Sequence, residues 1–361
     1  MKVLHLCSSY TQTDLYAQLI GRLSAMGAEN TVFVPVSSMP QKQYGENVIV
    51  SKCFNRLDSF FYLWKQMKIT RALNKSVDVS KFDLVHAHYL FTNGRAAMKI
   101  KQKYGTDYIV AVRNTDINVF FKYRINLRSL GVKILRGAKK VVVLSVSYFD
   151  KLLKYVPKRY KEEIKNKIVV LPNGINDFWF ENSYFKARDL SKINIAFAGT
   201  IDKNKNVLTS LEAIKLLSEE GKEVSYHVAG KIVDKGVYSQ MIKNPNVVYH
   251  GKLVKEELID VYRSCNIYLM PSHYETFGLV YAEALSQGLP VLYTKGQGFD
   301  GQFEDGEVGY AVVSTDANDI KDKILKVIEN YDKILPNIQH CLEKFKWDKI
   351  AKQYADLYGL R

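Results

Sequence analysis

Residues 266–291 decide the fold of the second half of the chain and read NIYLMPSHYETFGLVYAEALSQGLPV. The apolar run at 266–270 predicts a buried strand that ends at Pro271, and a short loop then leads to Gly278. From Gly278 to Gly288 the sequence predicts a helix, after which the chain returns into another apolar strand. A strand, a crossover helix and a second strand form a βαβ unit, which predicts a parallel sheet covered by helices.

The same alternation recurs along the whole chain, in two successive series. The expected strands lie at residues 2–7, 31–36, 83–88, 108–112, 140–145, 193–198, 224–229, 246–250, 266–270 and 289–293. The expected helices lie near residues 14–26, 57–73, 95–104, 125–136, 147–155, 206–219, 254–264, 279–287 and 317–330. A further strand is expected at 167–171, and the turn signal at 171–174 that follows it separates the series. We therefore predict an α/β protein with two doubly wound Rossmann-like domains, residues 1–174 and 175–345, facing across a deep cleft.

Composition places the chain among ordinary globular proteins. Of its 361 residues, 47% are hydrophobic and 25% are charged, which excludes a mostly disordered or fibrous protein. The longest apolar run is far shorter than the roughly 18 residues that a membrane span needs. The first nine residues have too short an apolar stretch for a signal peptide, and the four cysteines show no C-x-x-C spacing. We therefore expect a cytoplasmic protein.

Positive charge is concentrated in the first half of the chain. Residues 1–170 contain 29 basic and 11 acidic side chains, a net charge of +18, whereas residues 171–361 contain 23 and 26, a net charge of −3. Two stretches of the first half, 54–71 and 120–140, interleave basic and apolar residues. Such stretches either lie in the headgroup plane of an anionic membrane or pack their apolar face on the sheet, and both alternatives stay open. Nucleic acid is not an expected partner, because no zinc-finger spacing or RNA-recognition signature occurs.

The loop and helix after residue 270 have the residue types of a nucleotide-sugar site. Unpaired N–H groups at a helix N-terminus bind anions, and Gly278 lets a phosphate approach the main chain. Glu275 stands on the loop, where its carboxylate would face whatever the phosphate carries. Glu283 lies a little over one turn into the helix, where it would accept hydrogen bonds from vicinal hydroxyls. A diphosphate with polyols on both sides is a nucleotide-sugar.

The pattern E-x-F-G-x-x-x-x-E-A-x-x-x-G-x-P-V, which starts at Glu275, resembles the signature of the retaining glycosyltransferases of family 4, enzymes of bacterial glycan biosynthesis with the GT-B fold. The loop 198–206 resembles the family's G-R-L-x-x-x-K-G segment, whose cations hold the diphosphate, and Lys205 stands at its Lys position. Thr200 stands at the Arg position, so either Lys203 substitutes or the diphosphate is held with one cation fewer. The donor-binding residues that the resemblance implies are Gly199, Thr200, Lys203, Thr276, Phe277, Gly278, Leu279 and Glu283.

In the first domain the resemblance rests on single positions that follow predicted strands. The segment 85–89 ends a strand as the family's His-x-His does, which implies that His88 approaches the donor sugar. The first loop lacks the Gly pair that relatives carry near the donor phosphates, and the loop after residue 112 lacks their His. The expected acceptor-side residues are Ser9, Tyr10, Arg113, Asn114 and Asp116. Residues 345–348 resemble the start of the family's terminal helix, which implies that helix 346–361 packs back on the first domain.

We therefore expect a retaining glycosyltransferase of the hexosyltransferase type (EC 2.4), with Glu275, His88 and Lys205 as its catalytic residues. The expected donor is a nucleotide-diphosphate sugar, UDP- in preference to GDP-. The expected acceptor is a hydroxyl of a saccharide, on a lipid-linked glycan of cell-surface polysaccharide synthesis. No Asp-x-Asp occurs in the chain, so neither a metal ion nor a cofactor is expected.

Other functions stay open from the sequence. A glycoside hydrolase also uses two carboxylates, but it needs no diphosphate site. A nucleotide-sugar epimerase would share the GT-B architecture, and a non-catalytic nucleotide-sugar or membrane-binding module would share the charge pattern. The basic first half predicts peripheral contact with an anionic membrane, at the inner face of the plasma membrane.

Overall fold

The computed structural model describes residues 1–360, apart from the side chain of Ser59, and divides into two compact units. The first unit contains Met1–Leu144, Tyr148–Asn173 and Trp347–Arg361, and the second contains Ser145–Ser147 and Gly174–Lys346. The chain therefore crosses into the second unit at the predicted turn signal and returns to the first unit with its last helix. Arg361, at the end of the predicted segment 346–361, lies outside the described residues.

The first unit is a parallel sheet of seven strands in the order β3-β2-β1-β4-β5-β6-β7. The strands are β1 (Lys2–Leu6), β2 (Glu29–Val36), β3 (Val48–Lys52), β4 (Leu84–Ala87), β5 (Asp107–Ala111), β6 (Lys140–Val143) and β7 (Ile168–Val170). The helices are α1 (Leu15–Ala25), α2 (Tyr62–Ser76), α3 (Gly94–Tyr104), α4 (Arg128–Gly137), α5 (Val146–Lys154), α6 (Lys161–Lys165) and α14 (Trp347–Tyr358).

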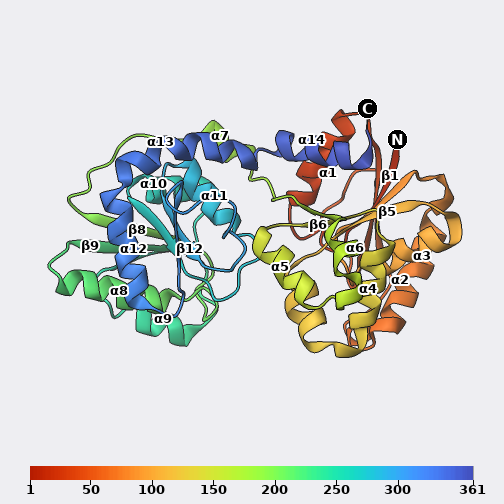
Figure 1. Cartoon of the computed structure of the whole chain (residues 1–361), viewed down its shortest axis with the longest axis horizontal. Coiled ribbons are helices and arrows are strands. Elements are labelled where there is room, and N and C mark those ends of the chain that lie inside the picture. The colour runs from red at the N-terminus through yellow and green to blue at the C-terminus, as the bar shows by residue number, and fades with distance from the viewer. Residues whose placement is uncertain (361) are drawn as a thin grey trace. The chain divides into compact units, whose positions relative to one another are not determined.

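Helices cover both faces of this sheet, which is why its central strands are apolar on both sides. Helices α2 to α6 bury one face, in a core that includes Leu6, Val85 and Val110. Helices α1 and α14 cover the other face and pack side by side, although they come from opposite ends of the chain (Figure 1). Arg22 of α1 donates to the Asp348 carboxylate at 2.7 Å and joins the two helices further.

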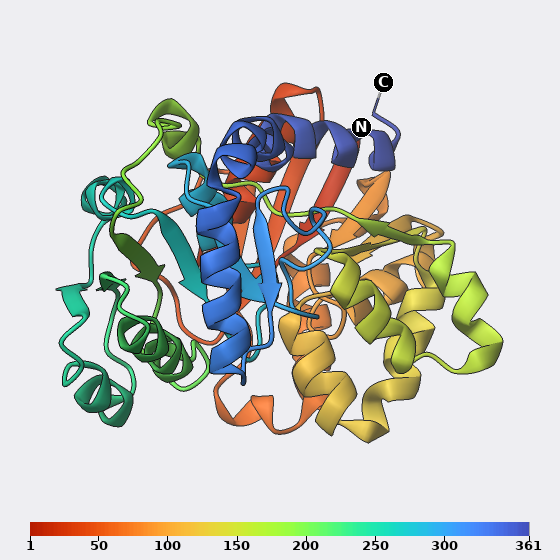
Figure 2. The same cartoon turned by 60° about the vertical axis from the view of Figure 1, so that its left-hand side comes forward.

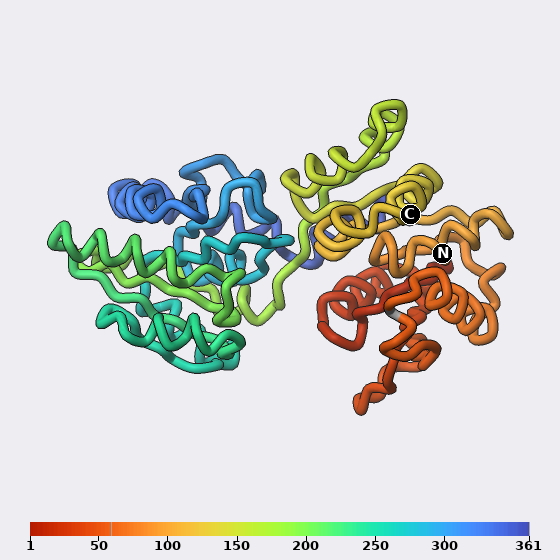
Figure 3. The backbone as a smooth tube through the Cα atoms, turned by 90° about the horizontal axis from the view of Figure 1, so that it is seen from below, coloured from red at the N-terminus to blue at the C-terminus, as the bar shows by residue number. Residues whose placement is uncertain are grey.

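The second unit is a parallel sheet of six strands in the order β10-β9-β8-β11-β12-β13. The strands are β8 (Ile193–Ala198), β9 (Val224–Ala229), β10 (Val247–Gly251), β11 (Ile267–Met270), β12 (Val291–Thr294) and β13 (Gly309–Val312). The helices are α7 (Asp177–Glu181), α8 (Val207–Glu219), α9 (Lys235–Met241), α10 (Lys255–Arg263), α11 (Leu279–Ser286), α12 (Ala317–Glu329) and α13 (Tyr331–Leu342). Helix α12 packs on the edge strand β13 (Figure 2), and α8 packs against both α9 and α12 (Figure 3).

Both sheets confirm the predicted doubly wound α/β class, and each predicted strand is present within a few residues. The edge strands β3 and β13 and the helices α6, α7, α9 and α13 were not predicted. The edge strands are short and only partly apolar, so their sequence pattern is weak. Helix α13 contains Pro336, a residue that normally indicates the end of a helix. The expected helix 125–136 begins as a 3₁₀ turn and becomes α4 at Arg128. Among the described helices, none is long and apolar enough to cross a membrane.

Strand order reverses once in each unit, between β1 and β4 in the first and between β8 and β11 in the second. Ligands of doubly wound sheets bind at such points, beside the carboxyl ends of the strands, because the adjacent loops there diverge to opposite faces. We therefore expect the candidate sites of both units in the loops after these strands.

Candidate active site

In the second unit, the loops that follow β8 and β11 are bound to each other through Asn204. The backbone N–H of His273 donates to the Asn204 carbonyl at 2.9 Å. The Asn204 amide donates to the carbonyl of Tyr274 at 3.0 Å and accepts from the Tyr274 N–H at 3.1 Å. These bonds fix two loops from adjacent strands as one surface. Asn204 was not singled out from the sequence, because an asparagine in a turn carries no distinctive signal.

Two predicted catalytic residues meet on this surface. The ammonium of Lys205 lies 2.6 Å from Oε2 of Glu275, and both side chains are mostly buried. The backbone of Lys205 is held by Asp202, whose carboxylate accepts its N–H at 3.0 Å. The pair presents a cation and an anion side by side, a combination that suits a ligand with a phosphate next to a hydroxyl-bearing group.

The loop after β12 holds Glu275 in place. The Glu275 N–H donates to the side-chain oxygen of Gln297 at 3.3 Å, and the Gly298 N–H donates to the Glu275 carbonyl at 2.9 Å. A Cβ on Gly298 would lie 2.1 Å from the carbonyl carbon of Thr276, so only glycine permits this approach. Gln297 and Gly298 are site residues that the sequence analysis missed. The signal that could have found them is the glycine pair Gly296 and Gly298 directly after a strand.

Gly278 shapes the start of helix α11. Its φ of +77° lies in the left-handed region, and a Cβ there would lie 2.4 Å from the ring of Tyr281. Phe277 is buried beside it, whereas Thr276 and Leu279 are partly buried. The backbone therefore turns sharply into α11, and the N-terminus of that helix follows Glu275 directly, as the sequence predicts.

Glu283 lies on α11, one turn beyond its start. Its carboxylate is partly buried, and burial raises its pKa from 4.5 to about 7. Among the described residues, no donor pairs with this carboxylate. A buried carboxylate without a partner is poised to accept hydrogen bonds from hydroxyl groups of a ligand.

The remaining predicted donor residues lie along the loop after β8. Gly199 donates its N–H to Ala229 at 3.0 Å, and the Thr200 hydroxyl donates to Asp202 at 2.6 Å. Thr200 and Lys203 are exposed. Lys203 lines a cavity of about 460 Å³ together with His273. Lys203 therefore adds a cation on this loop, and both its substitution for the missing arginine and its contact with a diphosphate stay predictions.

In the first unit, His88 directly follows β4 and is fully buried together with His5 of β1 and His86 of β4. Asn30 uses its amide nitrogen toward Ser24 at 2.9 Å, so its oxygen faces Nε2 of His5, at 2.8 Å. His5 must therefore donate from Nε2 and accept at Nδ1 from Nε2 of His88, at 3.0 Å. Burial lowers the pKa of all three histidines, that of His5 to about 4, so they are neutral. This series of hydrogen bonds leaves Nδ1 of His88 as a buried acceptor without a partner among the described residues.

The same three histidines are the described group whose side chains could hold a metal ion. His5, His86 and His88 each offer a nitrogen, and these lie within 4.8 Å of one another. Neutral imidazoles suit zinc and related metals. However, two of the nitrogens already share the hydrogen bond between His5 and His88, and Nδ1 of His86 lies 2.6 Å from the hydroxyl of Tyr358. The hydrogen bonds account for most of the ring nitrogens, and the expectation that no metal is needed stays a prediction.

The predicted acceptor-side residues divide into buried and accessible groups. Asp116 is fully buried and accepts three backbone N–H groups, from Leu90, Phe91 and Arg113, at 2.8–3.1 Å. Burial raises its pKa to about 6. Asp116 therefore joins the loops after β4 and β5. None of its surface is accessible to an acceptor in this structure. Arg113 is buried too and donates to the His88 carbonyl.

Asn114, Ser9 and Tyr10 are more accessible. Asn114 accepts hydrogen bonds from Asn118 and from the hydroxyl of Tyr148. Ser9 and Tyr10 lie in the turn after β1 and are partly buried. Contact of these residues with an acceptor stays a prediction. Contact of His88 with the donor sugar also stays a prediction, because none of its surface is exposed and a sugar would reach it only after neighbouring side chains move.

Comparison with known families extends these observations to both halves of the chain. Residues 15–177 match the model of the family described as Glycosyltransferase Family 4, and residues 181–339 match that of Glycosyl transferases group 1. An uncharacterized glycosyltransferase of Methanocaldococcus jannaschii is 26% identical over 334 residues, which cover 89% of this chain and 88% of that protein. The capsular polysaccharide biosynthesis glycosyltransferase CapM of Staphylococcus aureus is 30% identical over 206 residues, 52% of this chain and 53% of that protein.

Solved structures share the fold over the whole chain. Sucrose-phosphate synthase of Thermosynechococcus elongatus has a TM-score of 0.78 at 19% identity, covering 99% of this chain and 98% of that chain. HepE of Anabaena in complex with UDP-glucose has a TM-score of 0.68 at 15% identity, with the same coverage. These likenesses confirm the expected architecture, and the family matches favour transfer over the epimerase and binding-module alternatives. The chain belongs to glycosyltransferase family 4 and is a glycosyltransferase with the GT-B fold.

Proposed function

We propose that this glycosyltransferase transfers a hexose from a UDP-sugar to a hydroxyl of a saccharide acceptor, with retention of configuration. The observation that carries the proposal is the ion pair of Lys205 and Glu275 directly before the N-terminus of α11. The structures of HepE with UDP and with UDP-glucose support a uridine donor. The name of CapM supports an acceptor from cell-surface polysaccharide synthesis, for which we propose a lipid-linked glycan.

In the proposed mechanism, the second unit holds the donor through charge and hydrogen bonds. The N-terminus of α11 and the Lys205 ammonium neutralise the diphosphate as it leaves. Glu275 orients the hydroxyls of the sugar, and Glu283 accepts hydrogen bonds from the ribose. The bond from the anomeric carbon to the phosphate oxygen breaks, and the acceptor oxygen bonds to that carbon on the same face. The acceptor proton passes to the leaving phosphate oxygen.

His88 and metal ions enter the proposal in different ways. The His88 acceptor at Nδ1 is proposed to receive a hydroxyl of the donor sugar, once the side chains that cover it have moved. No metal is included, because a lysine and a helix N-terminus already supply positive charge to the diphosphate.

The donor part of the proposal is tested by a thermal-shift screen with UDP, GDP, ADP and their common sugars. A ligand at about 100 times its dissociation constant stabilises a protein by about 2.7 kcal/mol. We expect uridine nucleotides to shift the melting temperature most, and Glu283→Ala to remove the shift. Absence of a shift with every nucleotide would contradict the proposed donor. Analysis of the product anomer by NMR then tests retention.

A specific observation also favours the proposed contact with an anionic membrane. The two basic stretches differ in their helices: α4 of the second stretch packs Val132, Ile134 and Leu135 into the core, as the packing alternative predicts, although Tyr123 and Ile125 before it are exposed. In the first stretch, the segment before α2 and the first turn of α2 point outward. Leu57, Phe60 and Phe61 are each about 70% exposed. We call this group, together with the exposed Leu63 and Trp64, the apolar turn.

The composition around the apolar turn is that of an interfacial membrane contact, since aromatic rings enter the headgroup region while basic residues attract anionic lipid. Arg56 and Arg71 are exposed on the same segment. We expect binding to vesicles with 30% phosphatidylglycerol and little binding to pure phosphatidylcholine, with a loss of binding at high salt. The double variant F60S/F61S should lose this binding, whereas Tyr104→Ser, at an exposed aromatic of α3 outside both basic stretches, should retain it. Equal binding to both vesicles would overturn the membrane proposal.

A further inference from the structure

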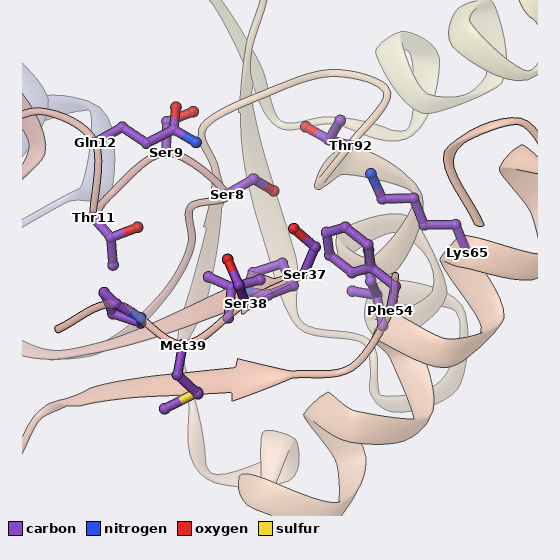
Figure 4. Close-up of a pocket in the computed structure, with 14 residues that line it drawn as sticks. Ser8, Ser9, Thr11, Gln12, Ser37, Ser38, Met39, Phe54, Lys65 and Thr92 are labelled. Atoms are coloured by element: carbon purple, nitrogen blue, oxygen red, sulfur yellow. The ribbon is translucent and has the colours of Figure 1, made fainter. Parts of the chain in front are cut away.

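The first unit contains a pocket of about 450 Å³ at the carboxyl ends of four adjacent strands (Figure 4). Its walls come from the loops after β1, β2, β3 and β4 and from one face of α2. The strand order reverses between β1 and β4, so the pocket lies where a doubly wound sheet binds ligands. All its lining residues belong to the first unit, separate from the Lys205 and Glu275 pair.

The lining is rich in hydroxyl groups and contains one charge. Among the described residues that line the pocket, Lys65 is the only charged one. The hydroxyl-bearing residues are Ser8, Ser9, Thr11, Ser37, Ser38 and Thr92. Hydroxyl groups donate and accept equally well, which suits a polyol, and a lone ammonium suits an anion.

Lys65 has no carboxylate partner among the residues that the structure describes. The nearby Asp58 is taken by Lys68, whose ammonium lies 2.8 Å and 2.9 Å from its two oxygens. Lys65 instead lies over the ring of Phe54, 4.0 Å from its centroid, and Figure 4 shows its ammonium on the Thr92 side of the pocket. Burial lowers the pKa of Lys65. A partly desolvated lysine that faces a cavity without a counter-ion gains most from an anionic ligand.

Thr92 and Ser8 add a second observation that points to a ligand. The Thr92 hydroxyl is buried and has no hydrogen-bond partner, which is uncommon in a folded protein. The Ser8 hydroxyl accepts from the Asn93 amide at 2.8 Å, which leaves its own hydrogen available to a ligand. Both side chains line the pocket with Lys65, so they would share one ligand.

We infer that this pocket binds the acceptor through an anionic group, most simply a phosphate monoester, with Lys65 as its cation and the hydroxyl residues as partners of the saccharide. The inference rests on the proposed function and narrows the acceptor class from saccharides in general to anionic ones. The phosphate could belong to a soluble sugar phosphate or to a lipid, because the exposed apolar turn leads directly into α2, the helix that carries Lys65.

Competitive labelling tests the inference at Lys65 itself. Trace acetic anhydride acetylates accessible amines of the full-length protein, and mass spectrometry of its peptides after digestion gives the labelling rate at each lysine. One arm uses glucose 6-phosphate against glucose, and the other uses phosphatidylcholine vesicles with and without 10% phosphatidic acid. We expect at least a fivefold lower labelling rate at Lys65 with a phosphate-bearing probe in one arm, which identifies the source. Lys133, an exposed lysine on α4, is the control and should not change.

Each outcome decides the inference. Protection of Lys65 by glucose equal to that by glucose 6-phosphate, or no protection in either arm, would overturn it. The variant Thr92→Val should weaken protection at Lys65 by several-fold, because it removes the unpaired hydroxyl and keeps the shape. Binding of UDP by the same protein, measured by thermal shift, separates the two proposals. UDP binding without protection of Lys65 refutes only the anionic acceptor. Protection of Lys65 without UDP binding refutes only the proposed UDP-sugar donor.

Discussion

The two units carry their polar groups differently, although both are doubly wound parallel sheets. In the second unit, Lys205 and Glu275 form a pair on partly accessible loops, and the residues that fix them are mainly glycines and amides. In the first unit, Asp116 and His88 are fully buried, and Asp116 holds loop backbones together. Polar residues that follow strands can therefore stay on accessible loops, where we propose that Lys205 and Glu275 contact the donor, or can be buried to support the loops, as Asp116 does.

The largest expected effect comes from the second unit. Glu275→Gln removes the negative charge beside Lys205 and keeps the size of the side chain, and we expect sugar transfer to fall roughly 10³-fold. UDP binding, followed by thermal shift, should stay within a few-fold, because the proposed role of Glu275 is toward the sugar. The measurement is product formation with the donor that the screen identifies.

A matched variant sharpens this result. Glu212 is an exposed glutamate on α8 of the same unit, so Glu212→Gln should leave transfer unchanged. Turnover that survives in Glu275→Gln would mean that the ion pair with Lys205 supports the loop, as Asp116 does in the first unit. The contrast between the two units would then disappear.

Glycines at equivalent backbone angles allow a second comparison of the units. Gly278 has a φ of +77° and a crowded surrounding, whereas Gly105, at the end of α3, has a φ of +78° and no atom within 4 Å of an added Cβ. Gly105→Ala should cost about 1 kcal/mol for the left-handed backbone alone. Gly278→Ala should cost about 2–4 kcal/mol, because the ring of Tyr281 must also move. Denaturant unfolding of both variants measures the difference, and equal costs would show that Tyr281 moves without strain.

The sequence predicts the second unit better than the first for a physical reason. Glu275, Gly278 and Glu283 lie within one contiguous stretch, so their spacing is visible in the sequence. The ion pair joins residues 70 positions apart, yet each follows a strand, and doubly wound topology places such ends together. Gln297 and Gly298 act through backbone contacts, and no side-chain type in the sequence signals those.

In the first unit, the pocket is built from five separate segments, which supply between one and six residues each. Serine and threonine after a strand are common in turns, so no single position signals a site. The burial of His88 and Asp116 also depends on how helices α1 and α14 and the loops pack, which residue type alone does not determine. Residue type indicates where charge can lie, but three-dimensional packing decides whether it reaches solvent.

The support role in the first unit can be tested at its terminal helix. The hydroxyl of Tyr358 on α14 lies 2.6 Å from Nδ1 of His86, and both residues are buried. Tyr358→Phe leaves that nitrogen without a partner, so we expect a loss of about 2 kcal/mol in the free energy of unfolding. Tyr123→Phe, at an exposed ring, should change it by less than about 0.5 kcal/mol. An equal effect of both variants would contradict a supporting hydrogen bond between α14 and the sheet.

Glu283 should make folding stability and ligand binding depend on pH in opposite directions. Its pKa in the folded protein is about 7 against an ordinary value of 4.5, so burial disfavours the ionised form. Folding is therefore less stable above pH 7 than below pH 4.5, and Glu283→Gln should stabilise the protein at pH 8, by about 2 kcal/mol, but not at pH 4.5. Ligand binding should respond with the reverse sign, because ribose hydroxyls donate to the ionised carboxylate.

From the pKa of about 7, the ionised fraction falls about tenfold between pH 8 and pH 6, and the affinity for UDP should fall by the same factor. Calorimetric titration at both pH values measures it, and Glu283→Gln should bind weakly with no such dependence. UDP itself has a phosphate that titrates near pH 6, so uridine, which lacks it, provides the control. A constant affinity for uridine across this range would show that Glu283 does not bind the ribose. Its raised pKa would then make it a buried group like Asp116, and the contrast between the two units would rest on Lys205 and Glu275 alone.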